Sequence, residues 1–220
     1  MMLKDLFNRY SVHQWGIASL DTTIEGATGY KCIAFGLPYD AAAVTALPDD
    51  KLIDRCKDDL SAKTKAIYAA IQEELCQYSF EFYDDIDRKL NLREKKVSQK
   101  VLGNLAGLGW IGKSSLLISP VLGPRMRLGT IFTKNELEAT DSPYVGSCGD
   151  CTICSEICPS GSISEEGYDV EKCRQVVCDD KGNYKTFCGL CMKMCPQGNA
   201  NKAMQSDART SRPVNRNVMN

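Results

Sequence analysis

The last third of the sequence carries a closely spaced run of cysteines that could bind metal. The run reads Cys148-x2-Cys151-x2-Cys154-x3-Cys158-Pro159. This is the bacterial ferredoxin spacing, in which three neighbouring thiolates bind one [4Fe–4S] cluster and the fourth binds a second cluster. The short intervals let a looping backbone surround a cubic cluster and direct its thiolates inward. The run therefore predicts a two-cluster iron–sulfur centre.

A second, shorter run reads Cys188-x2-Cys191-x3-Cys195-Pro196, and Lys185 stands where a full repeat would have a cysteine. The missing ligand must come from farther away, and Cys173 and Cys178 are both available. In two-cluster ferredoxins the last cysteine of a run binds the other run's cluster. We therefore expect one cluster on Cys148, Cys151, Cys154 and Cys195, and the other on Cys158, Cys188, Cys191 and either Cys173 or Cys178.

Zinc and disulfides are the alternative uses of these cysteines. Structural zinc sites usually pair C-x2-C ligands, often with histidine, but the single histidine, His13, is far away in the sequence. Disulfides need an oxidising compartment, and the N-terminal residues do not resemble an export signal. Two neighbouring clusters favour electron transfer over a purely structural role. The isolated Cys32, Cys56 and Cys76 are expected to be small buried side chains.

The composition is that of an ordinary globular protein. The 220 residues are 43% hydrophobic and 25% charged, which allows one core and a smaller appended module. The formal net charge of −1 gives no general attraction to nucleic acid or to an anionic membrane. No apolar run approaches the roughly 18 residues that span a bilayer. We therefore expect a cytoplasmic protein without a membrane partner.

Hydrophobic periodicity predicts a mixed α/β (α+β) chain. Helices are expected at 3–10, from Pro48 onward and at 95–106, and strands at 14–20, 31–37, 79–83, 115–118 and 127–133. Asp141-Ser142-Pro143 marks a boundary between these elements and the cysteines. We expect an α/β cofactor domain at 1–140, a cysteine module at 141–200 and a polar tail at 201–220.

A glycine-rich segment, Gly107-Leu108-Gly109-Trp110-Ile111-Gly112-Lys113-Ser114, matches two nucleotide-binding motifs at once. Both motifs require a strand before the glycines and a helix after them, because the helix N-terminus binds the phosphate. The expected order here is reversed, with a helix before the glycines and an extended segment after them. Two interpretations stay open: a tight loop packed against Trp110, or a cofactor pocket in which backbone amides and Lys113 face a polar group.

The glycine segment, followed by two cysteine runs that each end in Cys-Pro, resembles the epoxyqueuosine reductase family and its smaller relatives over about Val97 to Pro196. The resemblance implies a domain related in shape to flavin nitroreductases that holds cobalamin. A ferredoxin-like module would follow it and reduce the cobalt, an arrangement shared with reductive dehalogenases. Glu171-Lys172-Cys173 looks like the family position of the distant ligand, so the resemblance favours Cys173 over Cys178.

The resemblance also suggests which residues would bind the organic cofactor. Lys100, Lys113, Arg125 and Arg127 are candidates for contacts to anionic groups of the corrinoid, with ordinary surface charge as the alternative. No catalytic residue is assigned. The expected cofactor-binding residues are Lys100, Gly107, Gly109, Trp110, Gly112, Lys113, Arg125 and Arg127.

Two departures from the family affect the expected substrate. The positions at which the tRNA-modifying enzymes carry an aspartate and a glutamate hold Arg93 and Gln99. The chain also ends soon after the cysteines, without the helical repeats that accompany tRNA binding. We therefore expect a small-molecule or corrinoid-protein substrate, and tRNA is a doubtful partner.

The leading functional hypothesis is an oxidoreductase that passes electrons through two [4Fe–4S] clusters to a bound cobalamin. A ferredoxin, a flavodoxin or a reductase would supply the electrons. The alternatives are a non-catalytic ferredoxin-like carrier or reductive activator of a corrinoid protein, and a flavin-dependent reductase.

Overall fold

The computed structural model describes residues 2–12, 14–20, 24–48, 50–74, 79–92, 94–139, 143–183 and 188–198, without the side chains of Met2, Asp50 and Asp84. Several residues named above lie outside this part of the chain: His13, Cys76, Arg93, Lys185 and the tail at 201–220.

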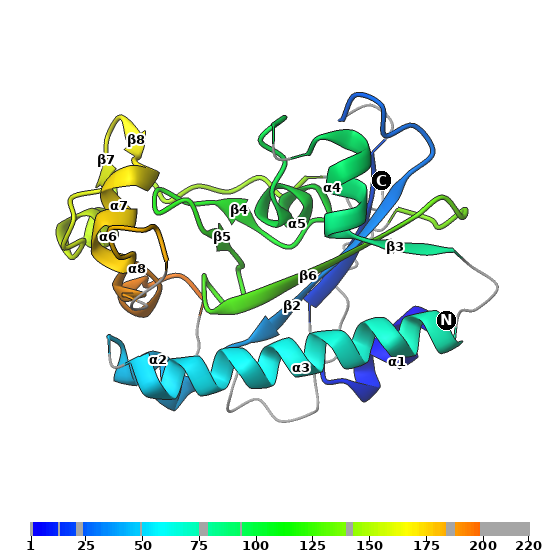
Figure 1. Cartoon of the computed structure of the whole chain (residues 1–220), viewed down its shortest axis with the longest axis horizontal. Helices are drawn as coiled ribbons and strands as arrows, with labels where there is room; N and C mark the ends of the chain where they lie inside the picture. Colours follow the sequence, from blue (N-terminus) through cyan, green and yellow to red (C-terminus); the bar gives the residue numbers. More distant parts are fainter. Residues whose placement is uncertain are drawn as a thin grey trace, which may run out of the picture.

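A four-stranded antiparallel sheet forms the centre of the fold, with the strand order β1-β2-β6-β3 (Figure 1). Its strands are β1 (Gln14–Ser19), β2 (Lys31–Pro38), β6 (Met126–Thr133) and β3 (Phe80–Phe82). The two long inner strands, β2 and β6, pair along their whole length, from Lys31 opposite Thr133 to Pro38 opposite Met126. The sheet therefore joins segments that are about a hundred residues apart in the sequence.

Alternating side chains of β2 serve two separate cores. Ile33, Phe35 and Leu37 face helices α1 (Met2–Arg9) and α3 (Asp50–Glu74). Cys32 and Ala34 face helices α4 (Tyr83–Leu90) and α5 (Gln99–Leu105). Figure 1 shows the two helix pairs on opposite faces of the sheet. The result is a three-layer arrangement, which confirms a mixed helix and strand fold.

Most of the expected elements are found, but two short helices that precede the cysteine segment, α2 and α4, were not predicted. Helix α2 (Ala41–Ala46) begins where the Asp40 carboxylate accepts a hydrogen bond from Ala43 N at 3.0 Å. Helix α4 lies in a densely charged stretch that gave only a weak hydrophobic pattern. Its Ile86 is fully buried, and Tyr83 and Leu90 pack partly buried against the same core. These three positions recur at helical spacing, which explains the fold of a segment with so many charges.

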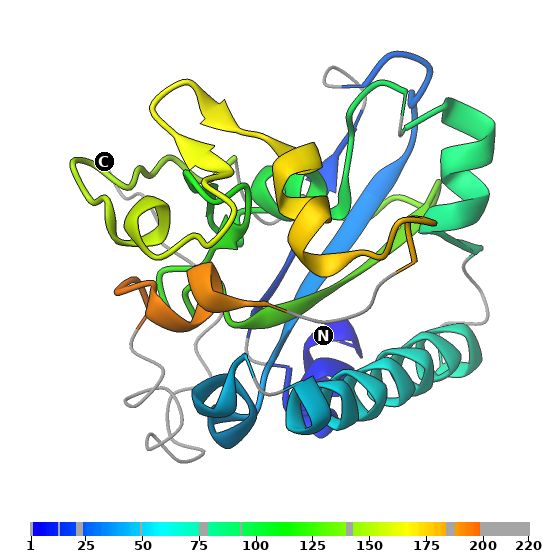
Figure 2. The same ribbon diagram turned by 60° about the vertical axis from the view of Figure 1, so that its left-hand side comes forward.

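The cysteines lie in a group of short elements at one end of the sheet (Figures 1 and 2). These are α6 (Ile153–Glu156), β7 (Ile163–Ser164), β8 (Gly167–Tyr168), α7 (Val170–Val177) and α8 (Leu190–Met194). Helix α8 packs against α2, since Met192 is buried with Val44 and Leu47. In addition, Lys193 Nζ donates a hydrogen bond to Leu47 O at 2.7 Å. The cysteine segment is therefore anchored to the elements that precede it.

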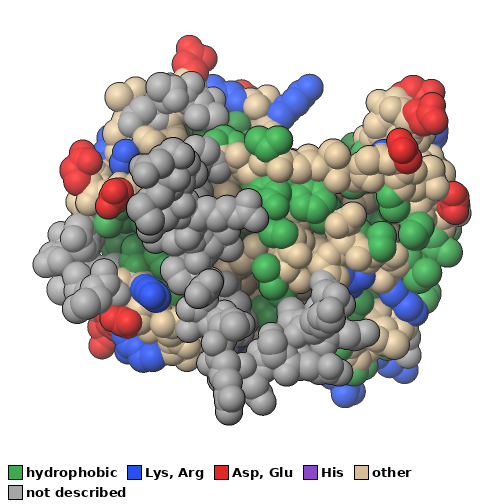
Figure 3. Space-filling model, turned by 180° about the vertical axis from the view of Figure 1, so that it is seen from behind, with side chains coloured by type: hydrophobic (Ala, Val, Ile, Leu, Met, Phe, Trp, Pro, Cys, Tyr) green, Lys and Arg blue, Asp and Glu red, His purple; other side chains and the backbone are tan. Residues whose placement is uncertain are grey.

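The described surface mixes apolar and charged groups. From behind, Figure 3 shows exposed hydrophobic and polar side chains, with positively charged lysine and arginine groups and negatively charged carboxylates around the edge. Within the described ranges, no helix is both long and apolar enough to cross a membrane.

Candidate metal centre

The predicted cluster ligands come from three short helices and the turns that flank them. Cys148 and Cys151 precede α6, Cys154 lies within it and Cys158 follows it. Cys173 is in the middle of α7. Cys188 precedes α8, Cys191 lies within it, and Cys195 is its C-terminal capping residue. Helices α6 and α8 pack against each other, so the two cysteine runs meet in space.

Four of these cysteines, which we call the first set, line a single hollow. They are Cys148, Cys151, Cys154 and Cys195, joined by Ser114, Ile118, Pro196 and Gln197. Burial, and then the charges of Cys148 and Cys151, raise the pKa of the Cys154 thiol. Burial likewise raises the pKa of Cys195. Thiol groups that are buried and crowded in this way stay protonated unless a cation is bound. This behaviour is expected of a set of metal-binding donors.

The other four, the second set, surround Cys191 and Tyr168. Burial, followed by the charges of Cys188, Cys154 and Cys173, raises the pKa of Cys191 to about 11. Burial and a hydrogen bond with Cys173 raise the pKa of Tyr168, and the charges of Cys173, Cys191 and Cys158 add to the effect. The second set is thus Cys158, Cys173, Cys188 and Cys191, and its neighbour in the first set is Cys154.

The two candidates for the distant ligand differ in their surroundings. Cys173 interacts electrostatically with Cys191 and Tyr168. Cys178 is buried at the C-terminal end of α7, where its backbone N–H donates to Arg174 O at 2.8 Å. Cys178 caps α7 with an extended backbone, so its thiol does not follow the helical arrangement that places Cys173. We therefore group Cys173 with the second set, and its role as the distant ligand stays a prediction.

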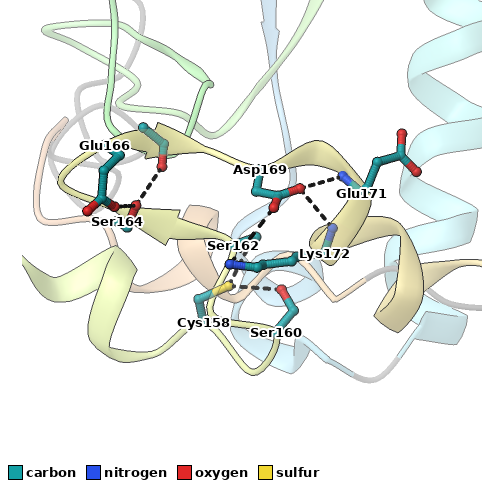
Figure 4. A network of polar contacts seen from close by, with 9 residues as sticks. Cys158, Ser160, Ser162, Ser164, Glu166, Asp169, Glu171 and Lys172 are labelled. Atoms are coloured by element: carbon teal, nitrogen blue, oxygen red, sulfur yellow. Dashed lines mark hydrogen bonds and ion pairs between the residues drawn. The ribbon is translucent and has the colours of Figure 1, made fainter.

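Cys158 has two hydroxyl neighbours. Its Sγ lies 3.3 Å from Ser160 Oγ and 3.1 Å from Ser162 Oγ (Figure 4). Partial burial opposes ionisation of Cys158, but the hydrogen bonds from both serines outweigh burial and lower its pKa to about 7. The sequence reasoning missed Ser160, Ser162 and Tyr168, although the serines directly after Cys158-Pro159 were a visible signal.

No disulfide joins the described cysteines. All eleven of them are free thiols. Across the described ranges, no three cysteine, histidine or carboxylate side chains converge closely enough to hold a single metal ion. A [4Fe–4S] cluster takes one thiolate at each iron atom, so its ligands surround a wider hollow than those of a single ion.

The glycine segment connects the sheet to the first set. Helix α5 leads through Gly107, at φ 79°, into a hairpin of β4 (Trp110–Ile111) and β5 (Leu117–Ile118). The helix comes before the glycines and a strand after them, which is the reverse of both nucleotide-binding motifs. A Cβ at Gly109 would lie 2.0 Å from Ile118 O, and one at Gly112 would lie 3.2 Å from Cys148 Sγ. These glycines allow the hairpin to close tightly and to contact the cysteines.

The predicted basic residues mostly contact backbone carbonyl groups. Lys100 Nζ donates to Ser115 O at 2.5 Å, and burial lowers the pKa of Lys100. Lys113 Nζ donates to Cys151 O at 3.0 Å. Arg127 interacts with the Tyr39 hydroxyl, while its Nε is buried without a hydrogen-bond partner. Their role as cofactor ligands stays a prediction.

Arg125 has a clear structural role at the end of α8. Its guanidinium donates to Lys193 O at 3.2 Å, to Gln197 O at 3.0 Å and to Cys195 O. The carbonyl groups at a helix C-terminus lack partners within the helix, and a cation there is favourable. Arg125 therefore holds the chain on both sides of Cys195.

Trp110 joins the hairpin to the start of the cysteine segment. It is 8% exposed and stacks on Tyr144 with ring centroids 5.8 Å apart. A Cβ at Gly146 would lie 2.6 Å from the indole, so the chain passes directly over Trp110. Its Nε1 is buried without a hydrogen-bond partner. Both interpretations of the glycine segment keep support, because Trp110 is packed and still has a free donor.

Sequence comparisons place epoxyqueuosine reductases among the relatives of this chain. No protein-family model matches it. The epoxyqueuosine reductase of Bacillus anthracis is 31% identical over 144 residues, which are 60% of this chain and 37% of that protein. The enzyme of Gloeobacter violaceus is 33% identical over 114 residues, covering 46% of this chain and 35% of that protein. The matched segment thus spans little more than a third of each of these two relatives.

Solved structures share the fold at lower identity. An epoxyqueuosine reductase with an epoxyqueuosine-modified tRNA-Tyr stem loop is 16% identical, covering 96% of this chain and 68% of its own, with a TM-score of 0.58. A reductive dehalogenase described as suggesting a mechanism for B12-dependent dehalogenation is 19% identical, covering 90% of this chain and 32% of its own, with a TM-score of 0.66.

These comparisons correct one expectation and confirm another. The expectation of a small-molecule or corrinoid-protein substrate, with tRNA doubtful, is wrong, because the relatives are named for epoxyqueuosine and one structural neighbour is bound to a modified tRNA stem loop. The alternatives of a simple electron carrier and a flavin reductase find no support among them. The resemblance itself is confirmed: by sequence and by fold, this chain is a relative of the epoxyqueuosine reductases.

Proposed function

We propose that this chain is an iron–sulfur reductase in which two [4Fe–4S] clusters pass electrons, one at a time, towards a bound corrinoid. The main support is the hollow lined by the first set, Cys148, Cys151, Cys154 and Cys195. Three of these residues are neighbours in the sequence and the fourth is about forty residues away. Convergence of such segments on one hollow is what the crossed ferredoxin pattern requires.

The second cluster is assigned to the second set, Cys158, Cys173, Cys188 and Cys191. Its support is the mutual electrostatic influence of these thiols around Cys191 and Tyr168. Cys154 of the first set also influences Cys191, so the two sets are adjacent. Adjacent clusters allow an electron to pass from one to the other.

The proposal divides the chain into a nitroreductase-like domain at 1–140 and a ferredoxin-like module at 141–200. The sheet and helices α1 to α5 lie in the first part, and the predicted cluster ligands lie in the second. The proposed tail at 201–220 lies outside the described residues. The glycine hairpin, which contacts Cys148, would then connect the two parts.

Cobalamin is the proposed organic cofactor, supported by the B12-dependent dehalogenase among the structural neighbours. When bound, it would supply a strongly reducing cobalt, and the protein would supply its position and electrostatic surroundings. Two predicted binding residues still have an unused buried donor, Trp110 Nε1 and Arg127 Nε. These groups fit contacts to the amide and phosphate oxygens of a corrinoid, because buried donors normally have an acceptor.

A modified tRNA stem loop is the proposed substrate class. The support is the stem loop bound to one structural neighbour, together with the names of the sequence relatives. At the family's second acidic position this chain has Gln99, the half-buried first residue of α5. A glutamine cannot deliver a proton as a carboxylic acid does, so any proton donor must be another group.

Anaerobic purification of the full chain tests the proposal. We expect about eight iron atoms per chain and a visible absorbance that bleaches with dithionite. Added cobalamin should co-elute with the protein, and the loaded protein should convert an epoxyqueuosine-containing stem loop. Colourless protein, or protein that carries zinc, would contradict the cluster assignment. Cobalamin that separates completely from an iron-loaded chain would contradict the corrinoid assignment alone.

A further inference from the structure

The two sets of cysteines differ in the groups that hydrogen-bond to their sulfur atoms. In the first set, the Sγ atoms of Cys154 and Cys195 accept from backbone N–H groups, which are those of Cys154, Ser155 and Gln197. In the second set, backbone N–H groups of Ser160, Ser162 and Met192 play the same part at Cys158 and Cys191, and Cys158 Sγ also lies 3.3 Å from Ser160 Oγ and 3.1 Å from Ser162 Oγ. Ser114 lines the hollow of the first set, but the hydroxyl groups within hydrogen-bond distance of a cysteine sulfur in the described ranges are those of the second set.

A third hydroxyl lies beside the same set, on the neighbouring hairpin. Burial raises the pKa of Tyr168, and the charges of Cys173, Cys191 and Cys158 add to the effect, so its hydroxyl group is near these sulfur atoms. Ser160 and Ser162 thus contact Cys158, and Tyr168 lies beside Cys173. We refer to these three residues as the hydroxyl donors.

The hydroxyl donors are held in place by the fold. Ser162 is 1% exposed, and its carbonyl accepts a hydrogen bond from Asp169 N at 2.8 Å. The Asp169 carboxylate in turn caps α7, the helix that carries Cys173, by accepting from Glu171 N and Lys172 N (Figure 4). Ile163 pairs with Tyr168 in the β7–β8 hairpin. Backbone hydrogen bonds therefore fix the hydroxyl donors relative to Cys158 and Cys173, in addition to their contacts with sulfur.

Hydrogen bonds to cluster sulfur raise the reduction potential of an iron–sulfur cluster. Reduction adds one negative charge, which is spread over the iron and sulfur atoms, so the sulfur atoms become better acceptors. A hydroxyl donor consequently stabilises the reduced cluster more than the oxidised one, as expected of hydrogen bonds to charged acceptors. The effect grows with the number of donors that reach the same cluster.

We propose that Ser160, Ser162 and Tyr168 raise the reduction potential of the second cluster above that of the first. This inference rests on the proposed function, because it requires both clusters to be present. An electron from a low-potential one-electron donor then resides first on the second cluster. Its transfer to the first cluster oxidises one cluster and reduces the other by one electron, and no bond or proton is exchanged. The hydroxyl donors thereby set the order in which the two clusters are reduced.

Redox titration of the fully loaded chain, followed by electron paramagnetic resonance, tests the inference. We expect two one-electron couples in the parent. In the double variant Ser160→Ala/Ser162→Ala, the couple with the higher reduction potential should shift to lower potential by about 59 mV. This shift corresponds to about a tenfold change in the ratio of oxidised to reduced cluster at a fixed potential. Tyr168→Phe should move the same couple in the same direction by a smaller amount. The lower couple should not move.

A matched control comes from the same hairpin. Ser164 Oγ donates to Glu166 Oε2 at 2.6 Å instead of to sulfur. Ser164→Ala should therefore leave both couples unchanged. Repeating the titrations in a Cys151→Ala background, which retains only the second cluster, identifies the couple that moves.

The outcomes separate this inference from the proposed function. A parent chain without two clusters would contradict the proposed function itself. Two clusters in the parent, with couples that stay unchanged in the iron-replete variants, would overturn the inference alone, as would a shift confined to the first cluster. If the buried Ser162 variant fails to load iron, the half-buried Ser160→Ala and the partly exposed Tyr168→Phe decide the result, because neither removes a buried side chain.

Discussion

Gly112 and Cys148 are in contact across the junction between the glycine hairpin and the cysteine segment. A Cβ at Gly112 would lie 2.7 Å from Ile118 Cγ1 and 3.2 Å from Cys148 Sγ. Ile118 and Cys148 both line the hollow of the first set. The glycine therefore permits the hairpin to form one wall of the hollow.

This contact predicts that side chains at position 112 disturb the first cluster selectively. In Gly112→Val the branched side chain cannot fit beside Cys148, so we expect bound iron to fall from about eight atoms towards four. Gly112→Ala should have a weaker effect, because a single methyl group requires a smaller movement of the Ile118 side chain than the branched side chain does. Iron analysis of anaerobically purified protein measures both, and parent-like iron in Gly112→Val would refute the contact.

Removing one ligand from each set should remove one cluster at a time. Cys151→Ala and Cys191→Ala should each retain about four iron atoms, and the double variant should retain almost none. Cys56→Ala is the matched control, since Cys56 lies outside both sets and accepts only a backbone hydrogen bond from Asp40 N. Equal iron in the parent and in both single variants would show that the ligand sets are wrong.

The choice between Cys173 and Cys178 can be decided by the same measurement. Cys173→Ala should lose about four iron atoms because it removes a ligand of the second cluster. Cys178→Ala should retain all of its iron and lose about 1 kcal/mol of unfolding free energy, because it removes a buried sulfur from a packed site. The reverse pattern of iron loss would assign the ligand to Cys178.

Arg125 should stabilise the chain segment around Cys195. Its guanidinium donates to the carbonyl groups of Lys193, Cys195 and Gln197, so Arg125→Ala leaves several helix-end acceptors without a partner. We expect a loss of about 2 kcal/mol in the free energy of unfolding, measured by anaerobic denaturant titration, together with faster loss of iron. Arg125→Lys should recover part of both.

The control for Arg125 is an exposed arginine. Arg88 forms a surface ion pair with Asp85, and its side chain is 77% exposed. Such pairs contribute little to stability, so Arg88→Ala should change the unfolding free energy by less than about 1 kcal/mol. If Arg88→Ala and Arg125→Ala were equally destabilised, the capping role of Arg125 would be untenable.

The sequence by itself predicted the chemistry of the cysteine runs and determined the order of elements around the glycines. Metal-ligand spacing operates over a few residues, so the intervals between Cys148 and Cys158 predict their use without knowledge of the fold. A helix before Gly107 and a strand after it could also be recognised locally, and this order excluded both nucleotide-binding motifs. Long periodic segments such as α3 were predicted for the same reason.

The tertiary structure decided which distant residues meet. The sequence left Cys173 and Cys178 open, because the distance of each thiol from Cys191 depends on how the chain folds around α7. The sequence shows that Lys100, Lys113 and Arg125 are charged, but it does not show their hydrogen-bond acceptors. These acceptors are carbonyl groups of other segments. Hydrogen bonds and close packing between segments far apart in the chain leave no periodic signal, and they exist only once the folded backbone brings the partners within reach.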